Sequence, residues 1–150
     1  MKKKLGMIAC VLGIVVLLFG CGAGSGSGSG GVSIDYGTSE IYTHEDMDQA
    51  IAVIKDEFSK WEGCKLYNIR YTSDEENNEE NIQWMNELAE GQGLEGGYTQ
   101  VIEFLSDFHS PVEQDEPSAW EPDTDYTDWN WWLARTDGGE WQLLTSGYGR

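Results

Sequence analysis

Apolar residues between positions 44 and 61 recur at steps of three and four, the spacing that gathers side chains on one face of an α-helix. The residues that share this stripe are Met47, Ala50, Ile51, Ile54, Phe58 and Trp61. Thr43 and Asp46 have the spacing of a capping box, and Gly63 is a typical helix stop. The pattern predicts a helix over 44–61 whose stripe faces a hydrophobic core.

Four later stretches alternate apolar with polar residues, as β-strands do. The predicted strands are 64–71, 98–108, 126–136 and 140–148. The second of them has apolar residues on both sides, which predicts at least partial cover on both faces of the sheet. One side carries Val101 and Leu105, and the other carries Ile102, Phe104 and Phe108.

The last two strands are joined by Asp137-Gly138-Gly139, a strong signal for a hairpin turn. The pairs that a three-residue turn places opposite one another are Arg135 with Trp141, Leu133 with Leu143, and Trp131 with Thr145. The side chains that then share one face are Trp129, Trp131, Leu133, Trp141 and Leu143, with Arg135 able to stack on Trp141. Trp132 and Leu144 would lie on the opposite face, which needs its own cover or leaves an aromatic-walled hollow.

A second helix is predicted over 75–90, because Ser73 and Glu76 again have capping-box spacing and Gly91 follows as a stop. Its apolar residues are confined to its second half, so the acidic first half is expected to face solvent. Residues 109–125 contain three prolines and five acidic residues from 113 to 123, and they predict a loop.

This order of elements predicts a single α+β domain over 42–150. A curved antiparallel sheet of about four strands would pack on the long N-terminal helix, with a second helix added. The arrangement resembles the cystatin-like and NTF2-like folds.

Residues 1–20 have the layout of an export signal. Lys2, Lys3 and Lys4 precede a charge-free apolar run over 5–19, which is shorter than the roughly 20 residues of a membrane-spanning helix. The run ends in Leu18-Phe19-Gly20-Cys21, which resembles a bacterial lipobox. We therefore expect a signal peptide over 1–20 and lipid on Cys21, which would anchor the domain to the cell membrane on its extracytoplasmic face. A retained signal anchor and a cleaved, unlipidated form are the alternatives, and both also place the domain outside the cytoplasm.

Residues 22–31 alternate Gly with Ser or Ala and cannot bury apolar surface. The sequence therefore predicts a flexible tether over 21–41, with a root-mean-square reach of about 25 Å from Cys21 to the domain.

The chain after the signal peptide is strongly acidic. Beyond Cys21 it has six basic and 27 acidic residues, a formal charge of −21, compared with −18 for the whole chain. Anionic lipid headgroups and nucleic acids repel such a domain, so nucleic-acid binding is excluded. After processing, Cys64 is the one cysteine left unmodified, so the domain has no internal disulfide and must fold on its core. Cys64 itself is interpreted as a small buried hydrophobic residue.

Several segments together resemble small lipoproteins of Gram-positive bacteria. The residues that carry this resemblance are Tyr42-Thr43-His44-Glu45-Asp46, Gly63-Cys64, Tyr126-Thr127-Asp128-Trp129-Asn130-Trp131, Arg135, Trp141 and Gly147-Tyr148. The resemblance covers most of the domain and implies a fold and a location. It implies no activity.

Asp123, Asp125 and Asp128 form a D-x-D-x-x-D pattern similar to part of a calcium-binding loop. The pattern lacks the glycine and the final glutamate of an EF-hand, so the alternative is a solvated turn and no cofactor. A zinc site would need His44 and His109 to meet, although one belongs to a predicted helix and the other to a loop.

The seven tryptophans are the stronger indication of a binding site. Trp120 lies in the acidic loop outside any apolar period, which favours an exposed ring, and indoles beside carboxylates are used by carbohydrate and cationic-peptide sites. The alternative is that most tryptophans fill the core. The expected ligand-binding residues are Trp120, Trp132, Asp123, Asp125 and Asp128.

These observations predict a membrane-tethered binding or accessory domain with an unidentified extracellular ligand or protein partner. The chain lacks the G-x-S-x-G, H-E-x-x-H and phosphate-loop motifs, so an enzyme is the less favoured class. The alternative function is a pocket enzyme of NTF2-like type that uses a buried carboxylate, such as Glu103 or Asp107, as acid or base.

Overall fold

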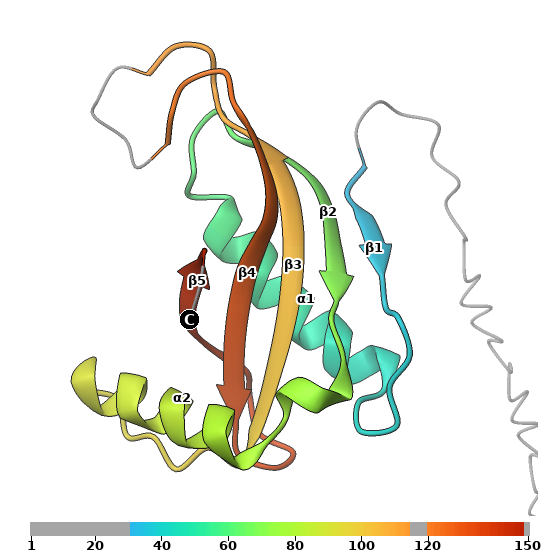
Figure 1. Cartoon of the computed structure of the whole chain (residues 1–150), viewed down its shortest axis with the longest axis vertical. Coiled ribbons are helices and arrows are strands. Elements are labelled where there is room, and N and C mark those ends of the chain that lie inside the picture. The colour runs from blue at the N-terminus through green and yellow to red at the C-terminus, as the bar shows by residue number, and fades with distance from the viewer. Residues whose placement is uncertain (1–30, 115–119, 149–150) are drawn as a thin grey trace, which may run out of the picture.

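The computed structural model describes residues 31–114 and 120–148, and the predicted signal peptide, Cys21 and the tether up to residue 30 lie outside these ranges. The described chain forms an α+β domain with one five-stranded sheet in the order β1-β2-β3-β4-β5 (Figure 1). The strands are β1 (Ser33–Asp35), β2 (Lys65–Tyr71), β3 (Gln100–His109), β4 (Asp125–Arg135) and β5 (Gln142–Gly147). The helices are α1 (His44–Phe58), α2 (Glu79–Gly91) and the 3-10 turn η1 (Asp74–Glu76).

The sheet is mixed, whereas the sequence predicted about four antiparallel strands. Strands β2 to β5 pair in antiparallel succession, but β1 runs parallel to β2, with Ile34 opposite Ile69. Strand β1 lies within the range expected to be a tether, and Ile34 packs partly against the core. Three residues are too few to show an alternating pattern, which explains why the sequence did not reveal this strand.

Helix α1 begins as predicted. The Thr43 hydroxyl accepts a hydrogen bond from the Asp46 N–H at 3.1 Å, and the Asp46 carboxylate accepts one from the Thr43 N–H at 2.9 Å. The helix ends at Phe58 instead of near residue 61, because the next residues tighten into i to i+3 hydrogen bonds such as the 2.9 Å bond from the Trp61 N–H to the Phe58 carbonyl. Trp61 leaves the helical path and stacks on Trp131, with ring centroids 5.1 Å apart.

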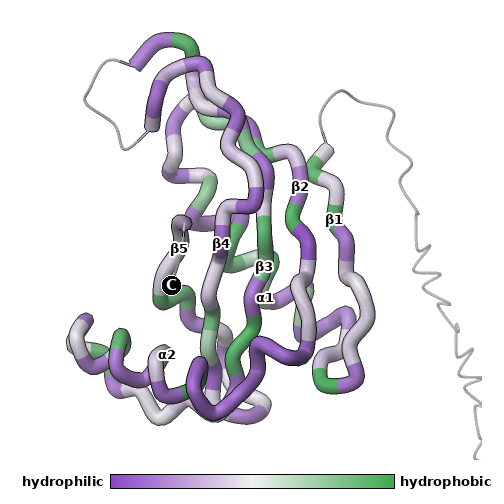
Figure 2. Tube along the Cα trace, in the orientation of Figure 1, coloured by the Kyte–Doolittle hydropathy of each residue, from purple (hydrophilic) through white to green (hydrophobic). Residues whose placement is uncertain are grey.

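The two faces of the sheet have separate cores. Helix α1 packs its predicted stripe, led by Met47, Ile51 and Ile54, on a face that includes Phe104 and Trp131. The opposite face carries a smaller cluster with α2, whose buried members are Met85, Ala89, Val101, Trp132, Ala134 and Leu144. Hydrophobic positions follow β3, whereas most loop positions at either end of the sheet are hydrophilic (Figure 2). None of the helices in the described ranges is long and apolar enough to cross a bilayer.

The hairpin of β4 and β5 has most of the geometry that the sequence predicts. Leu133 pairs with Leu143, and the Arg135 guanidinium lies 4.3 Å from the centre of a Trp141 ring. Trp132 and Leu144 both belong to the cluster opposite α1. The register then shifts by one residue, so Trp131 pairs with Ser146 and the predicted pairing with Thr145 is wrong. A bulge of this kind follows from tertiary packing and leaves no local signal.

The predicted start of the second helix is also wrong. Ser73 makes no capping hydrogen bond, and η1 is separated from α2, whose cap is Asn78. The Asp74 carboxylate is instead engaged by long-range contacts: it accepts hydrogen bonds from the Ser39 hydroxyl at 2.5 Å and the Glu40 N–H at 2.7 Å. These tertiary bonds outweigh the local capping pattern.

Asp46 links the start of α1 to a buried cation, because its carboxylate lies 2.9 Å from Nη1 of Arg135, whose side chain is only 6% exposed. We expect Asp46→Ala to lower the free energy of unfolding by about 2–4 kcal/mol, since it leaves a buried guanidinium unpaired. Thr43→Ala removes only the cap and should cost about 1 kcal/mol. Urea unfolding of both variants measures the difference, and equal losses would show that the Arg135 pair contributes nothing.

Candidate functional site

The five predicted ligand residues do not form one site. Trp120 belongs to the aromatic core on the α1 side of the sheet, and Trp132 lies on the other face. Asp123 and Asp125 contact His109, and Asp128 contacts Arg70. The structure therefore divides them among four environments.

Trp120 is half-buried and not the isolated exposed ring that its loop position favoured. Its ring centroid lies 4.5 Å from that of Trp61 and 5.5 Å from those of Phe108 and Trp129. Trp120 thus packs against the cluster on the α1 side of the sheet, and a loop residue shows no apolar period that would predict such packing. In the same cluster, Tyr148 is 60% exposed.

Trp132 lies beneath α2 and not in an open hollow. It is 5% exposed, and its ring meets Trp84 of α2 edge to face at 5.2 Å. Its Nε1 is buried and has no hydrogen-bond partner among the described residues. The helix therefore covers the surface that the sequence pattern left open as an aromatic-walled hollow.

Asp123 and Asp125 hold His109 from two sides. Nδ1 of His109 lies 2.7 Å from Asp125 and Nε2 lies 3.0 Å from Asp123, and the hydrogen bond with Asp125 is the main cause that raises the pKa of His109. His44 stacks on Tyr36 at 4.4 Å, at the start of α1, so the two histidines do not meet.

The aspartates do not converge as a calcium loop requires, because Oδ1 of Asp128 instead lies 2.5 Å from Nη2 of Arg70. In the part of the chain that the structure describes, no group of three or more His, Cys, Asp or Glu residues is arranged to hold a metal ion.

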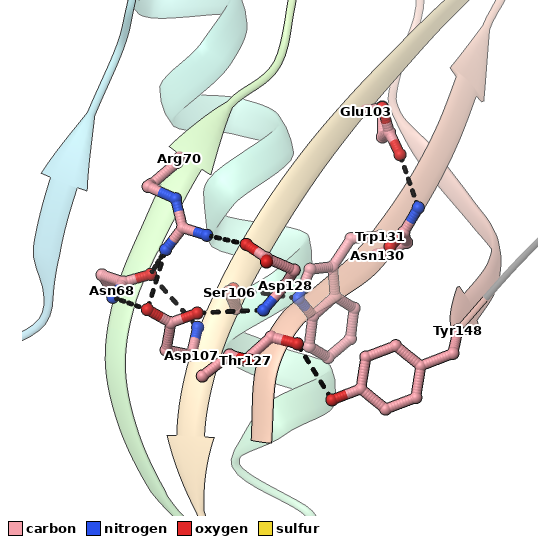
Figure 3. A network of polar contacts seen from close by, with 10 residues as sticks. All are labelled: Asn68, Arg70, Glu103, Ser106, Asp107, Thr127, Asp128, Asn130, Trp131 and Tyr148. Atoms are coloured by element: carbon pink, nitrogen blue, oxygen red, sulfur yellow. Dashed lines mark hydrogen bonds and ion pairs between the residues drawn. The ribbon is translucent and has the colours of Figure 1, made fainter. Parts of the chain in front are cut away.

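A polar network crosses β2, β3 and β4 on the face away from α1 (Figure 3). Arg70 pairs with Asp107 at 2.9 Å and with Asp128 at 2.5 Å, and Asn68 donates to Asp107 at 2.8 Å. The backbone of Asp128 is left-handed, with φ of 56°, and its N–H donates to Asp107 at 3.0 Å. Each charged group in the network thus has a partner inside it.

Asp107 is poorly suited to act as a base. Burial raises the pKa of Asp107, but hydrogen bonds from Asn68, the Asp128 N–H and Arg70 outweigh burial and hold that pKa below its usual value. A carboxylate that is already saturated by donors gains little from accepting a proton.

Glu103 has the opposite character. It is 7% exposed, and burial is the main cause that raises its pKa to about 7, although Asn130 donates a hydrogen bond to it at 2.6 Å (Figure 3). It lies opposite Trp132 in the sheet. Cys64 is a less reactive candidate, because burial raises the pKa of its thiol.

A groove of about 460 Å³ lies between α1 and the edge strand β5. Its α1 wall is formed by Val53, Asp56, Glu57 and Lys60, and residues 141–146 form the other wall. Val53 and Leu143 are partly buried members of the core, so the groove has apolar surface between polar rims. The groove was not among the features predicted from the sequence. The available signal was the uncharged stretch 141–147 in a chain of which 24% is charged.

Glu103 gives the domain a pH-dependent stability. Its pKa is raised from 4.5 to about 7, so the folded state binds a proton that the unfolded state releases. The stability contribution is therefore complete below pH 4.5 and is lost as the pH rises towards 7. Relative to wild type, Glu103→Gln should raise the free energy of unfolding at pH 8 by about 1–3 kcal/mol and change it little at pH 4.5. Urea unfolding at both pH values, with exposed Glu95→Gln as control, measures this, and an equal effect at both values would contradict it.

No protein-family model, curated protein sequence or solved structure matches this chain.

Proposed function

We propose that this protein is a lipid-anchored extracytoplasmic domain that binds another polypeptide along the unpaired edge of its sheet. Its location rests on Leu18-Phe19-Gly20-Cys21, which follows a charge-free apolar run and precedes a Gly- and Ser-rich stretch. Lipid on Cys21 is the proposed link to the membrane. Binding is proposed ahead of catalysis because the groove adjoins a strand edge, and Glu103, the carboxyl group with the raised pKa, does not line it.

The observation that supports binding is the character of β5. This six-residue strand forms one edge of the sheet and contains neither a charged residue nor a proline. Proteins commonly protect long edges with such residues, because unpaired N–H and C=O groups recruit other strands. The opposite edge, β1, has only three residues. Within β5, the Leu144 carbonyl already accepts a hydrogen bond from the Gln92 side chain at 2.8 Å. The remainder of this uncharged edge, beside a helix-lined groove, is the arrangement used to add a peptide strand to a sheet.

The order of the strands separates the anchor from the binding edge. Ser33 is the twelfth residue after Cys21, so the tether that remains before β1 has a root-mean-square reach of about 20 Å. Strand β5 lies four strand positions from β1, which corresponds to about 19 Å across the sheet. A domain anchored at the β1 edge would thus keep the β5 edge away from the anchor and open to a partner.

We also propose that the fold is a variant of the cystatin-like and NTF2-like architecture, and that the protein is similar to small lipoproteins of Gram-positive bacteria. The long helix α1 on one face of the antiparallel strands β2 to β5 supports the proposed fold. The proposed similarity to lipoproteins rests on the sequence segments alone. Strand β1 and the covering helix α2 are then additions to that plan.

The alternative function is a pocket enzyme with Glu103 as acid or base. Its buried carboxyl group and its pKa of about 7 favour this role. Glu103 is not among the residues that line the groove. Glu103→Gln should therefore leave polypeptide binding unchanged, so one variant separates the two functions.

Lipidation can be tested in a Gram-positive host that is grown with an alkyne-labelled fatty acid. We expect the full-length chain to carry the label and to sediment with membranes, and Cys21→Ala to lose the label because the thiol that accepts the lipid is gone. Cys64→Ala is the matched control and should keep it. Label retained by Cys21→Ala would refute the anchor.

Strand addition can be tested with the lipidated chain in phosphatidylcholine nanodiscs. The probes are fluorescent 12-residue peptides in which Val alternates with Lys, Ser or Glu. We expect at least one to bind above empty nanodiscs, and to lose binding when alternate backbone nitrogens are methylated, because every second N–H of a strand faces the same neighbour. Two methylated forms of each peptide are needed, because either alternate set of its N–H groups can face β5. One form is methylated at every Val nitrogen, and the other at every Lys, Ser or Glu nitrogen. Binding that survives in both would exclude strand addition.

A further inference from the structure

We propose that the polypeptide partner is an extended cationic segment, with Lys or Arg at alternate positions, that lies antiparallel or parallel to β5 in the groove against α1. This inference rests on the proposed function and adds the chemistry of the partner. Three features carry it: the charges on the α1 wall, the apolar surface between the walls, and the charge of the whole domain.

The α1 wall has an excess of negative charge. Glu57 pairs with Lys60 at 2.8 Å, with the two side chains 36% and 63% exposed. Asp56 has no ion-pair partner in the described ranges, so one carboxylate on this wall is left for an incoming cation. Strand β5 supplies no charge of either sign. A partner that is paired with β5 would therefore meet carboxylates on its α1 side.

The apolar surface of the groove selects an alternating partner. Val53 of α1 and Leu143 of β5 contribute apolar side chains to the same groove. In an extended segment, residues on one side repeat about every 6.6–6.8 Å, and their neighbours point the other way. Lysines on the α1 side would lay their aliphatic stems over Val53 and Leu143 and bring their charged ends to the carboxylates of the α1 wall. The apolar residues between them would point to the opposite face of the sheet, where Leu144 of β5 lies.

The net charge disfavours a second copy of this chain in the groove. Each processed chain has a formal charge of −21, so two β5 edges would meet under strong mutual repulsion. The same field attracts a cationic segment and speeds its association. The acidity therefore protects the uncharged edge from pairing with itself and leaves it open to partners of opposite charge.

The test compares the Val-Lys, Val-Ser and Val-Glu peptides on the same nanodiscs by fluorescence anisotropy. Phosphatidylcholine has no net charge, so lipid alone does not favour the lysine peptide. We expect the order of affinity Lys, Ser, Glu, and a loss of affinity for the Val-Lys peptide as salt is raised from 50 to 500 mM, because salt screens exposed charges.

A matched pair of variants locates the charge effect. Asp56→Asn with Glu57→Gln should raise the Kd of the Val-Lys peptide by about 3- to 10-fold, as expected for two partly exposed charge pairs. Glu75→Gln with Glu95→Gln removes the same charge from exposed positions outside the groove lining and should have a much smaller effect. Equal effects of the two pairs would overturn the assignment to the groove.

The outcomes distinguish this inference from the function on which it rests. If the Val-Ser peptide binds as tightly as the Val-Lys peptide, strand addition stands and the cationic partner is wrong. If no peptide binds, the proposed function fails as well. If light scattering of the unliganded protein shows a dimer that Asp56→Asn with Glu57→Gln strengthens, the groove is an interface between copies and the inference is refuted.

Discussion

The buried guanidinium of Arg135 is the interaction on which the arrangement of α1 over the sheet depends. It pairs with Asp46 at the start of α1, donates to Gln100 of β3 at 2.8 Å and stacks on Trp141 at 4.3 Å. The Trp141 Nε1 in turn donates to the Asp46 carbonyl at 2.9 Å. A buried cation is tolerated only when it is fully paired, so these contacts fix the helix relative to β3, β4 and the start of β5. The spacing between α1 and β5, and with it the groove, follows from this constraint.

Features with a local physical cause could be predicted from the sequence. The helix stripe, the capping box and the pairing of Leu133 with Leu143 follow from side-chain period and turn chemistry. Features set by distant partners could not be predicted. The capping signal at Ser73 lost to the tertiary bonds of Asp74, and Trp120 packs on rings that only the fold brings near it. The groove was missed for the same reason, since an edge is a property of the assembled sheet.

The hydrophobic core and the acidic residues have separate roles in this domain. The sheet buries aromatic residues on both faces, so apolar packing supplies most of its interior, and the Asp46–Arg135 pair adds a buried charged contact. Most carboxylates are left at the surface, where they contribute a field instead of specific bonds. Among the exceptions are the network around Arg70 and the pair on His109, which fasten the far end of the sheet and the adjoining loop. Asp46, Asp74 and Glu103 also make specific bonds.

The short parallel pairing of β1 with β2 also determines how the domain responds to a pulling force. Any pull between a membrane anchor and the rest of the domain enters the fold through β1, which is held to the sheet over three residues, whereas β3 and β4 are joined along most of their length. Under tension β1 would peel away first and leave α1 and strands β2 to β5 intact. The connector would gain length at little energetic cost, so under the proposed lipid anchor this edge strand would yield before the folded body does.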